Sequence, residues 1–210
     1  MKKRILCFGD SNTWGYIPEC GTRYPDDVRW TGILAGELGE GYCILEEGLN
    51  GRTTVFSDLM EPERCGITHV LPTILSQLPL DYIFVMLGTN DTKSHFHVNA
   101  IEIGYGMEEL LLKMQRILDL QGSKAKIILV SPVPVCSRVD PMFDEESISK
   151  SLKLADIYKK LAEERKWLYM NAASVVTETG ADGIHMTEEG HEKLGKAFAT
   201  YIKNQERCLL

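Results

Sequence analysis

Three polar side chains in this 210-residue sequence are of the types that nucleophilic catalysis on an acyl group requires. Ser11 follows the apolar run 5–8 and a glycine, and Asp182 and His185 lie three positions apart near the C-terminal end. A serine hydroxyl becomes a good nucleophile when an imidazole takes its proton, and a carboxylate on the other ring nitrogen fixes the tautomer of that imidazole. Ser11, His185 and Asp182 could therefore act as nucleophile, base and acid. The alternative is that Ser11 only caps the following helix, because serine is a favoured N-cap residue.

Acyl transfer also requires hydrogen-bond donors for the oxyanion of the tetrahedral intermediate. Asn90 follows the apolar run 82–88, and Gly51 lies in the loop that leaves the apolar run 42–46. A glycine lets a ligand approach its backbone N–H closely, although an isolated glycine more often marks only a tight turn. The backbone N–H groups of Ser11 and Gly51, with the side-chain amide of Asn90, could form an oxyanion hole.

These residues must be brought together by the elements around them. Apolar runs and helical spacing predict five strands alternating with five helices, and the chain has no internal repeat. The expected strands are 4–9, 42–46, 81–88, 126–131 and 167–171, and the expected helices are 28–38, 70–78, 107–118, 151–165 and 187–203. Such alternation predicts a parallel sheet covered by helices on both faces, a three-layer α/β/α sandwich in one domain, residues 1–210. In such sheets the chemistry lies at the carboxyl ends of the strands.

The four blocks around Ser11, Gly51, Asn90 and His185 resemble those of the SGNH hydrolases, also called the GDSL esterase/lipase family. The matching segments read Gly-Asp-Ser at 9–11, Gly-Thr-Asn-Asp at 88–91 and Asp-Gly-Ile-His at 182–185. The resemblance implies that Ser11, Asp182 and His185 are catalytic and that Ser11, Gly51 and Asn90 form the oxyanion hole. It also implies a flavodoxin-like fold with the strand order 2-1-3-4-5. The G-x-S-x-G elbow is absent around Ser11, which disfavours the classical α/β-hydrolase fold.

Further segments make the likeness more specific. Residues 27–32, 46–54 and 86–93 look like the arylesterase/acyltransferase subgroup, so the resemblance spans nearly the whole chain. It implies a serine esterase that hydrolyses small aryl or alkyl esters through an acyl-enzyme, and some members of the subgroup transfer the acyl group to alcohols. A carbohydrate O-acetyl esterase would share the same residues. A non-catalytic, flavodoxin-like binding protein is disfavoured because the segment 9–15 lacks the lysine of a phosphate loop. We expect no cofactor.

Three residues are predicted to bind the substrate. Asn12 stands where the family name has leucine, and because it follows the nucleophile we expect it to line the pocket and influence acyl specificity. Trp14 and Tyr16 fit an apolar acyl wall and the core equally well. His95 follows the segment 88–91 and alternates with His97, a spacing that could hold a metal. No Asp/Glu/His trio accompanies the pair, which favours histidines at the pocket rim over a metal site.

Other polar residues have structural interpretations. Asp10 could be the triad acid, but its side chain should point away from the adjacent serine, so we expect it to anchor the loop. His191 falls on the apolar stripe of the last expected helix and is predicted to be a packed histidine. The irregular stretch 133–148 is typical of a lid, binding loop or interface, and it could cover the pocket of its own chain or of a neighbour.

Composition limits the classes of partner. The net charge of −7 disfavours binding to nucleic acid or to an anionic membrane, which would require clustered lysine and arginine. The apolar run that follows the basic residues 2–4 is too short for a signal peptide, and no run approaches a membrane span. Six cysteines are scattered singly and are expected to be reduced. We therefore expect a cytoplasmic protein whose partner is a small-molecule ester, and, like some members of the subgroup, it could be a homo-oligomer.

Overall fold

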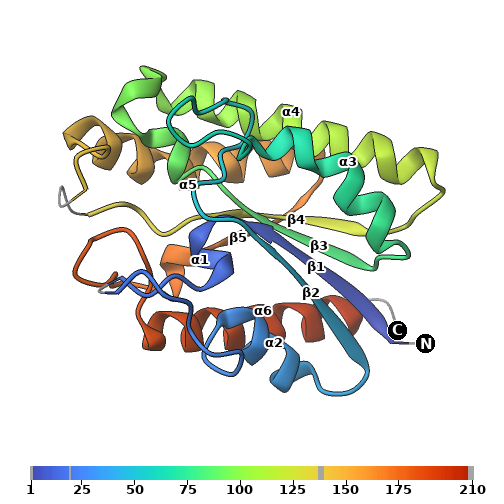
Figure 1. Cartoon of the computed structure of the whole chain (residues 1–210). Helices are drawn as coiled ribbons and strands as arrows, with labels where there is room; N and C mark the ends of the chain where they lie inside the picture. The colour runs from blue at the N-terminus through green and yellow to red at the C-terminus, as the bar shows by residue number, and fades with distance from the viewer. Residues whose placement is uncertain (1, 19, 137–139, 208–210) are drawn as a thin grey trace.

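The computed structural model describes residues 2–18, 20–136 and 140–207, and within them five parallel strands form one sheet (Figure 1). The strands are β1 (Lys3–Gly9), β2 (Tyr42–Gly48), β3 (Tyr82–Met86), β4 (Lys126–Ser131) and β5 (Leu168–Asn171). Their order across the sheet is β2-β1-β3-β4-β5, and every neighbouring pair is parallel. The fold class and the strand order that the resemblance implied are confirmed.

Helices cover both faces of the sheet and complete a three-layer sandwich (Figure 1). One face carries α2 (Trp30–Leu38) and α6 (Glu188–Arg207), and the other carries α3 (Gly66–Gln77), α4 (Ala100–Leu120) and α5 (Glu145–Arg165). Successive side chains of a strand point to opposite faces. Accordingly Leu6 and Phe8 of β1 pack into the core beneath α3, α4 and α5, whereas Ile5 and Cys7 pack beneath α2 and α6.

The central strands create the place where a site can form. All five residues of β3 are buried, as expected for a strand covered on both faces. The helix α2, which follows β1 in the chain, covers one face, and the helix α4, which follows β3, covers the other. A crevice therefore opens beyond the carboxyl ends of these adjacent strands, which is where open α/β sheets bind their ligands. Ser11 follows β1 and Asn90 follows β3.

Two helices near this edge differ from the prediction. A short helix, α1 (Ser11–Trp14), replaces the expected turn, and it ends at Gly15 with φ of 90°. The helix α4 begins at Ala100, seven residues before the predicted start, because Asn99 and Glu102 form a capping box. Gly104 lies inside this helix, where an added Cβ would come within 2.5 Å of Ile157 Cγ2. The glycine thus allows α4 and α5 to approach closely.

The stretch 133–148 is only partly irregular. The helix α5 begins at Glu145, because the Asp144 side chain accepts a hydrogen bond from the Ser147 N–H and caps the helix. The last four residues of the expected loop are therefore helical, and residues 137–139 of it lie outside the described residues. Short 3-10 turns also occur at η1 (Asn90–Thr92), η2 (Ser94–Phe96) and η3 (Ala172–Ser174). None of the helices in the described ranges is long and apolar enough to cross a membrane.

Candidate active site

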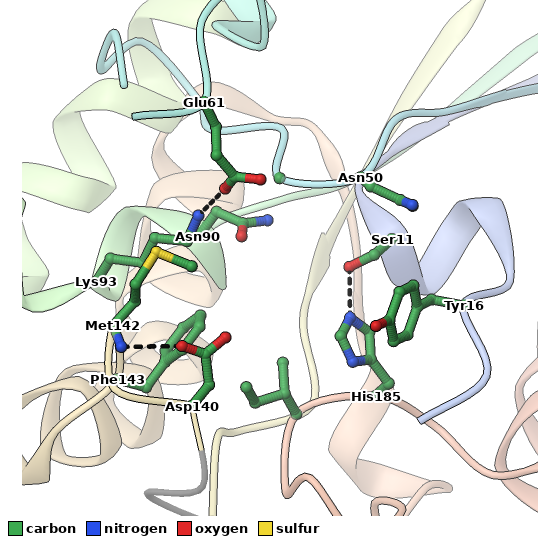
Figure 2. Close-up of a pocket in the computed structure, with 12 residues that line it drawn as sticks. Ser11, Tyr16, Asn50, Glu61, Asn90, Lys93, Asp140, Met142, Phe143 and His185 are labelled. Carbon is green, nitrogen blue, oxygen red and sulfur yellow. Dashed lines mark hydrogen bonds and ion pairs between the residues drawn. The ribbon is translucent and has the colours of Figure 1, made fainter. Parts of the chain in front are cut away.

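Ser11 is held at the carboxyl end of β1 by the tight turn into α1. Asp10 caps this helix by accepting a hydrogen bond from the Asn12 N–H at 2.9 Å. Gly9 has no room for a side chain, because an added Cβ would lie 2.0 Å from Thr13 Oγ1. Ser11 is only 7% exposed, and its Oγ lies 2.8 Å from His185 Nε2 (Figure 2). The turn therefore presents the hydroxyl to an imidazole, the arrangement that nucleophilic catalysis requires.

Asp182 completes the chain of hydrogen bonds from the other side of the imidazole. Its Oδ2 lies 2.6 Å from His185 Nδ1, and its Oδ1 accepts the N–H groups of Ile184 at 2.9 Å and His185 at 3.0 Å. Burial opposes ionisation of this carboxyl, but the hydrogen bonds from the ring and the two N–H groups outweigh it and lower the pKa of Asp182. An ionised Asp182 favours the proton on Nδ1, which leaves Nε2 free to accept the Ser11 proton.

Possible donors for an oxyanion line the same cavity as this hydroxyl. Gly51 follows β2 with φ of 75°, a conformation that favours glycine, and Asn90 opens η1 after β3. The Asn90 amide nitrogen donates one hydrogen bond to the Arg52 carbonyl at 3.2 Å, which leaves its second hydrogen available to a ligand. Within the described ranges no acceptor is present for the backbone N–H of Ser11 or of Gly51. Three donors are therefore available at the site.

These groups open into one small cavity of about 130 Å³. It is smaller than the range of about 300–1,000 Å³ typical of pockets for drug-sized ligands. The lining residues are Ser11, Tyr16, Asn50, Gly51, Glu61, Asn90, Lys93, Asp140, Met142, Phe143, Ile184 and His185. A substrate that enters it must have a small reacting group.

Comparisons with known proteins agree with this geometry. The model of the GDSL-like lipase/acylhydrolase family matches residues 7–193. The chain belongs to this family. Comparison with curated proteins finds no match.

Three solved structures of esterases are similar to this chain. Est24, a carbohydrate acetylesterase from Sinorhizobium meliloti, is 39% identical with a TM-score of 0.92, covering 97% of this chain and 100% of that one. The aryl esterase of M. smegmatis is 39% identical with a TM-score of 0.91, and the match covers 96% of this chain and 99% of that one. A carbohydrate acetylesterase family member from Sinorhizobium meliloti is 32% identical with a TM-score of 0.84, and the match covers 96% of this chain and 97% of that one. The chain is accordingly a carboxylic ester hydrolase, and the alternative of a non-catalytic binding protein is set aside.

Asn12 does not occupy the place predicted for it. Its side chain is buried and is not among those that line the cavity. The amide nitrogen donates to the Ile184 carbonyl at 3.3 Å, and the amide oxygen accepts the Met186 N–H at 2.9 Å. These two backbone groups flank His185, so Asn12 connects the turn at Ser11 to the loop that carries His185. The second position of α1 points toward that loop and not toward the cavity.

The other two predicted binding residues also lie outside the cavity lining. Trp14 is half-buried with the Arg23 guanidinium 5.3 Å from its ring centroid. Tyr16 lines the cavity instead, with its ring centroid 4.2 Å from that of His185. His95 Nε2 lies 3.2 Å from Asp58 Oδ2. Among the residues with described positions, no group of three or more His, Cys, Asp or Glu side chains could hold a metal ion.

The wall opposite Ser11 and His185 carries charged residues that were not predicted to be site residues. Figure 2 shows Glu61, Lys93 and Asp140 on that side of the cavity. Lys93 is 1% exposed, and its Nζ is hydrogen-bonded to Glu61 Oε2. Lys93 lies within the segment 86–93 that carries the family resemblance, but nothing in its spacing indicates that its side chain enters the cavity.

Asp10 and His191 have the structural places that were expected. Asp10 is buried and anchors the turn through the Asn12 N–H, and burial raises its pKa from the ordinary value of 3.8 to about 6. His191 is buried beneath Trp30, whose backbone N–H donates to His191 Nδ1 at 3.3 Å. Burial lowers the pKa of His191 to about 4, so the ring is neutral near pH 7.

The raised pKa of Asp10 leads to a prediction about stability. The folded-state pKa of about 6 exceeds the ordinary value of 3.8, so the protonated carboxyl favours the folded state below pH 4 and this advantage disappears as the pH rises through 6. Asp10→Asn keeps an oxygen for the Asn12 N–H and carries no charge. We expect it to raise the free energy of unfolding by about 2–3 kcal/mol at pH 8 and to change it little at pH 4. Urea unfolding at both pH values measures this, and an equal change at both would contradict the explanation.

Proposed function

We propose that this GDSL-family esterase hydrolyses small aryl and alkyl carboxylic esters through an acyl-enzyme on Ser11. The observation that carries the proposal is the unbroken chain of hydrogen bonds from Ser11 through His185 to Asp182. The Ser11 end of this chain lines a small cavity. This arrangement supplies the nucleophile, the base and the group that orients the base. The proposed partner is a small-molecule ester.

In the first half-reaction the Ser11 oxygen attacks the ester carbonyl carbon while His185 Nε2 takes the hydroxyl proton. The carbonyl oxygen becomes an oxyanion, and the N–H groups of Ser11 and Gly51 and the Asn90 amide stabilise it. His185 then gives the proton to the departing alcohol or phenol oxygen as the bond between the carbonyl carbon and that oxygen breaks. The acyl group remains bound to Ser11.

The second half-reaction repeats these steps with a new acceptor. A water molecule attacks the acyl carbon, His185 takes its proton, and the acid leaves as Ser11 recovers the proton. An alcohol can replace the water, in which case the product is a new ester. Tyr16 and Ile184 lie beside His185 in the cavity lining, where their apolar surface would limit the access of water to the acyl-enzyme. Acyl transfer to alcohols is therefore part of the proposal.

A second candidate is a carbohydrate O-acetyl esterase. The carboxylates of Glu61 and Asp140 line the cavity opposite His185 and could accept hydrogen bonds from the hydroxyl groups of a sugar. Est24, which is described as a carbohydrate acetylesterase, is 39% identical to this chain. An acetylated sugar would use the same triad and oxyanion hole.

Rates on a matched set of esters separate the two candidates. We expect wild-type enzyme to hydrolyse 4-nitrophenyl acetate and butyrate much faster than the octanoate, because the cavity holds about 130 Å³. Excess alcohol should divert part of the acyl group into a new ester. A higher kcat/KM on acetylated xylose than on 4-nitrophenyl acetate would favour the carbohydrate candidate. No turnover of any of these esters would contradict both.

A further inference from the structure

One peptide unit of the oxyanion hole is held from outside the cavity. The Gly51 N–H, one of the proposed oxyanion donors, belongs to the same peptide group as the Asn50 carbonyl, and this carbonyl accepts a hydrogen bond from Arg64 Nη1 at 2.8 Å. A peptide group is planar and its C=O and N–H point in opposite directions, so a bond that fixes one also orients the other. A glycine permits backbone rotation that other residues resist. Arg64 therefore restrains a peptide that could otherwise turn.

Arg64 is itself held in place at both its ends. Its backbone carbonyl accepts the Thr53 N–H at 3.2 Å, which ties the residue to the loop after β2. Its Nη1 also donates to Glu61 Oε1 at 2.6 Å. Glu61 lies against Gly51, because a Cβ added to Gly51 would come within 2.8 Å of Glu61 Oε2. The Arg64 guanidinium thus bridges the Glu61 carboxylate and the Asn50 carbonyl.

The same carboxylate also reaches the other side of the hole. Glu61 Oε2 accepts a hydrogen bond from Lys93, which lies three residues after Asn90 (Figure 2). The Lys93 ammonium is 3.5 Å from Asp58 Oδ2, so its charge is compensated within the buried wall. Glu61 consequently connects the segment that presents the Gly51 N–H with the segment that presents the Asn90 amide.

We propose that Arg64, held by Glu61, is a positioning residue that keeps the Gly51 N–H directed at the oxyanion. This inference rests on the proposed function, because it assigns Arg64 to the same transition state. The hydrogen bond from a cation to the Asn50 carbonyl also polarises the peptide and strengthens the N–H as a donor.

If the ion pair between Arg64 and Glu61 only stabilised the fold, its loss would have a different effect on the kinetics. The Arg64 side chain is 34% exposed and that of Glu61 is 23% exposed. Ion pairs as accessible to solvent as this one contribute little to stability, so a purely structural role predicts a slightly changed melting temperature and a nearly unchanged rate when the pair is lost. A positioning role predicts a fall in kcat with KM little changed, because the oxyanion forms only after the substrate is bound.

The test compares Arg64→Ala with a matched control. Arg165 of α5 also forms an ion pair, with Glu108, and the two side chains are 48% and 18% exposed. We expect Arg64→Ala to lower kcat on 4-nitrophenyl acetate about 10-fold to 100-fold, less than the 100-fold to 1,000-fold typical when a donor is removed outright. Arg165→Ala should keep kcat within about twofold. Arg64→Lys, which retains a cationic donor, should recover part of the loss.

Two outcomes separate this inference from the proposed function. The ¹H–¹⁵N resonance of Gly51 should shift in Arg64→Ala and not in Arg165→Ala, a readout that needs no substrate. If wild type hydrolyses the ester and Arg64→Ala keeps wild-type kcat with an unmoved Gly51 resonance, the inference fails while the proposed function stands. If wild type lacks esterase activity but the Gly51 resonance shifts, the proposed function fails and the restraint on the peptide is retained. A rise in KM alone would also overturn the positioning role.

Discussion

Replacing Ser11 by alanine is expected to lower kcat for ester hydrolysis by a factor on the order of 10⁵ to 10⁶. The Ser11 oxygen is the atom proposed to form the covalent acyl-enzyme, and among the described residues no other hydroxyl is hydrogen-bonded to His185 Nε2. Because the oxyanion donors remain, a small rate above that of the uncatalysed reaction should persist. Initial rates on 4-nitrophenyl acetate, with the release of nitrophenolate followed optically, measure the loss.

A serine far from the cavity provides the control for this substitution. Ser76 lies on α3, is exposed, and donates to the Thr73 carbonyl within its own helix. Ser76→Ala should therefore keep the wild-type rate. Ser11→Ala should also unfold at a temperature close to that of wild type, because the change removes only one small side-chain atom. A Ser11→Ala enzyme with more than one-tenth of the wild-type rate would exclude Ser11 as the nucleophile.

The second large effect is expected from Asp182→Asn, with a fall in kcat of about 10⁴-fold. Asparagine can still accept the backbone N–H groups of Ile184 and His185 through its amide oxygen, so the loop should keep its shape. Its amide nitrogen, however, can donate to His185 Nδ1, which places the ring proton on Nε2. That tautomer cannot accept the Ser11 proton, and the charge that stabilises the imidazolium is lost.

Asp119→Asn is a suitable control for this change. Asp119 lies near the C-terminal end of α4, is exposed, and accepts a hydrogen bond from Gln115. Its neutralisation should leave kcat and KM unaltered. We expect the Asp182→Asn enzyme to retain weak but measurable turnover, whereas an effect smaller than tenfold would show that Asp182 does not orient the histidine.

Much of the site was predictable because its residues follow strands that end at the same edge of the sheet. Ser11 lies two residues after the end of β1 and Asn90 four residues after the end of β3, so a parallel sheet brings them to the same edge whatever the length of chain between them. The spacing of Asp182 and His185 lets one carboxylate serve both the ring and the backbone of its own loop. These are properties of residue type and order, which a single sequence contains.

The opposite wall of the cavity was not predictable in the same way. Glu61 lies in a polar stretch without periodicity, and Lys93 turns inward because two carboxylates from the loop before α3 compensate its charge. That compensation is a long-range contact, which neither spacing nor composition reveals. The prediction that Asn12 lines the pocket differs from the structure for a related reason. Its position next to Ser11 suggested that it lines the pocket, but in α1 its side chain is directed toward the backbone on either side of His185.

Two helices begin earlier than the apolar spacing predicted. Gly104 and Gly106 disfavour a helix on propensity alone, but the capping box of Asn99 and Glu102 starts α4 seven residues before the predicted position 107. The helix α3 begins at Gly66, four residues before its predicted start, with Pro72 inside it. Proline is typical of a first helical turn, whereas Pro72 lies six residues after the first residue of α3.

The most direct test of the central claim is to trap the covalent intermediate. The protein would be treated with an alkyl fluorophosphonate, which reacts with an activated serine, and its intact mass and peptide masses would be measured. We predict one adduct per chain on the peptide that contains Ser11, and none on the Ser11→Ala protein. Absence of an adduct on wild type, or an adduct on another residue, would contradict the assignment of Ser11 as the nucleophile.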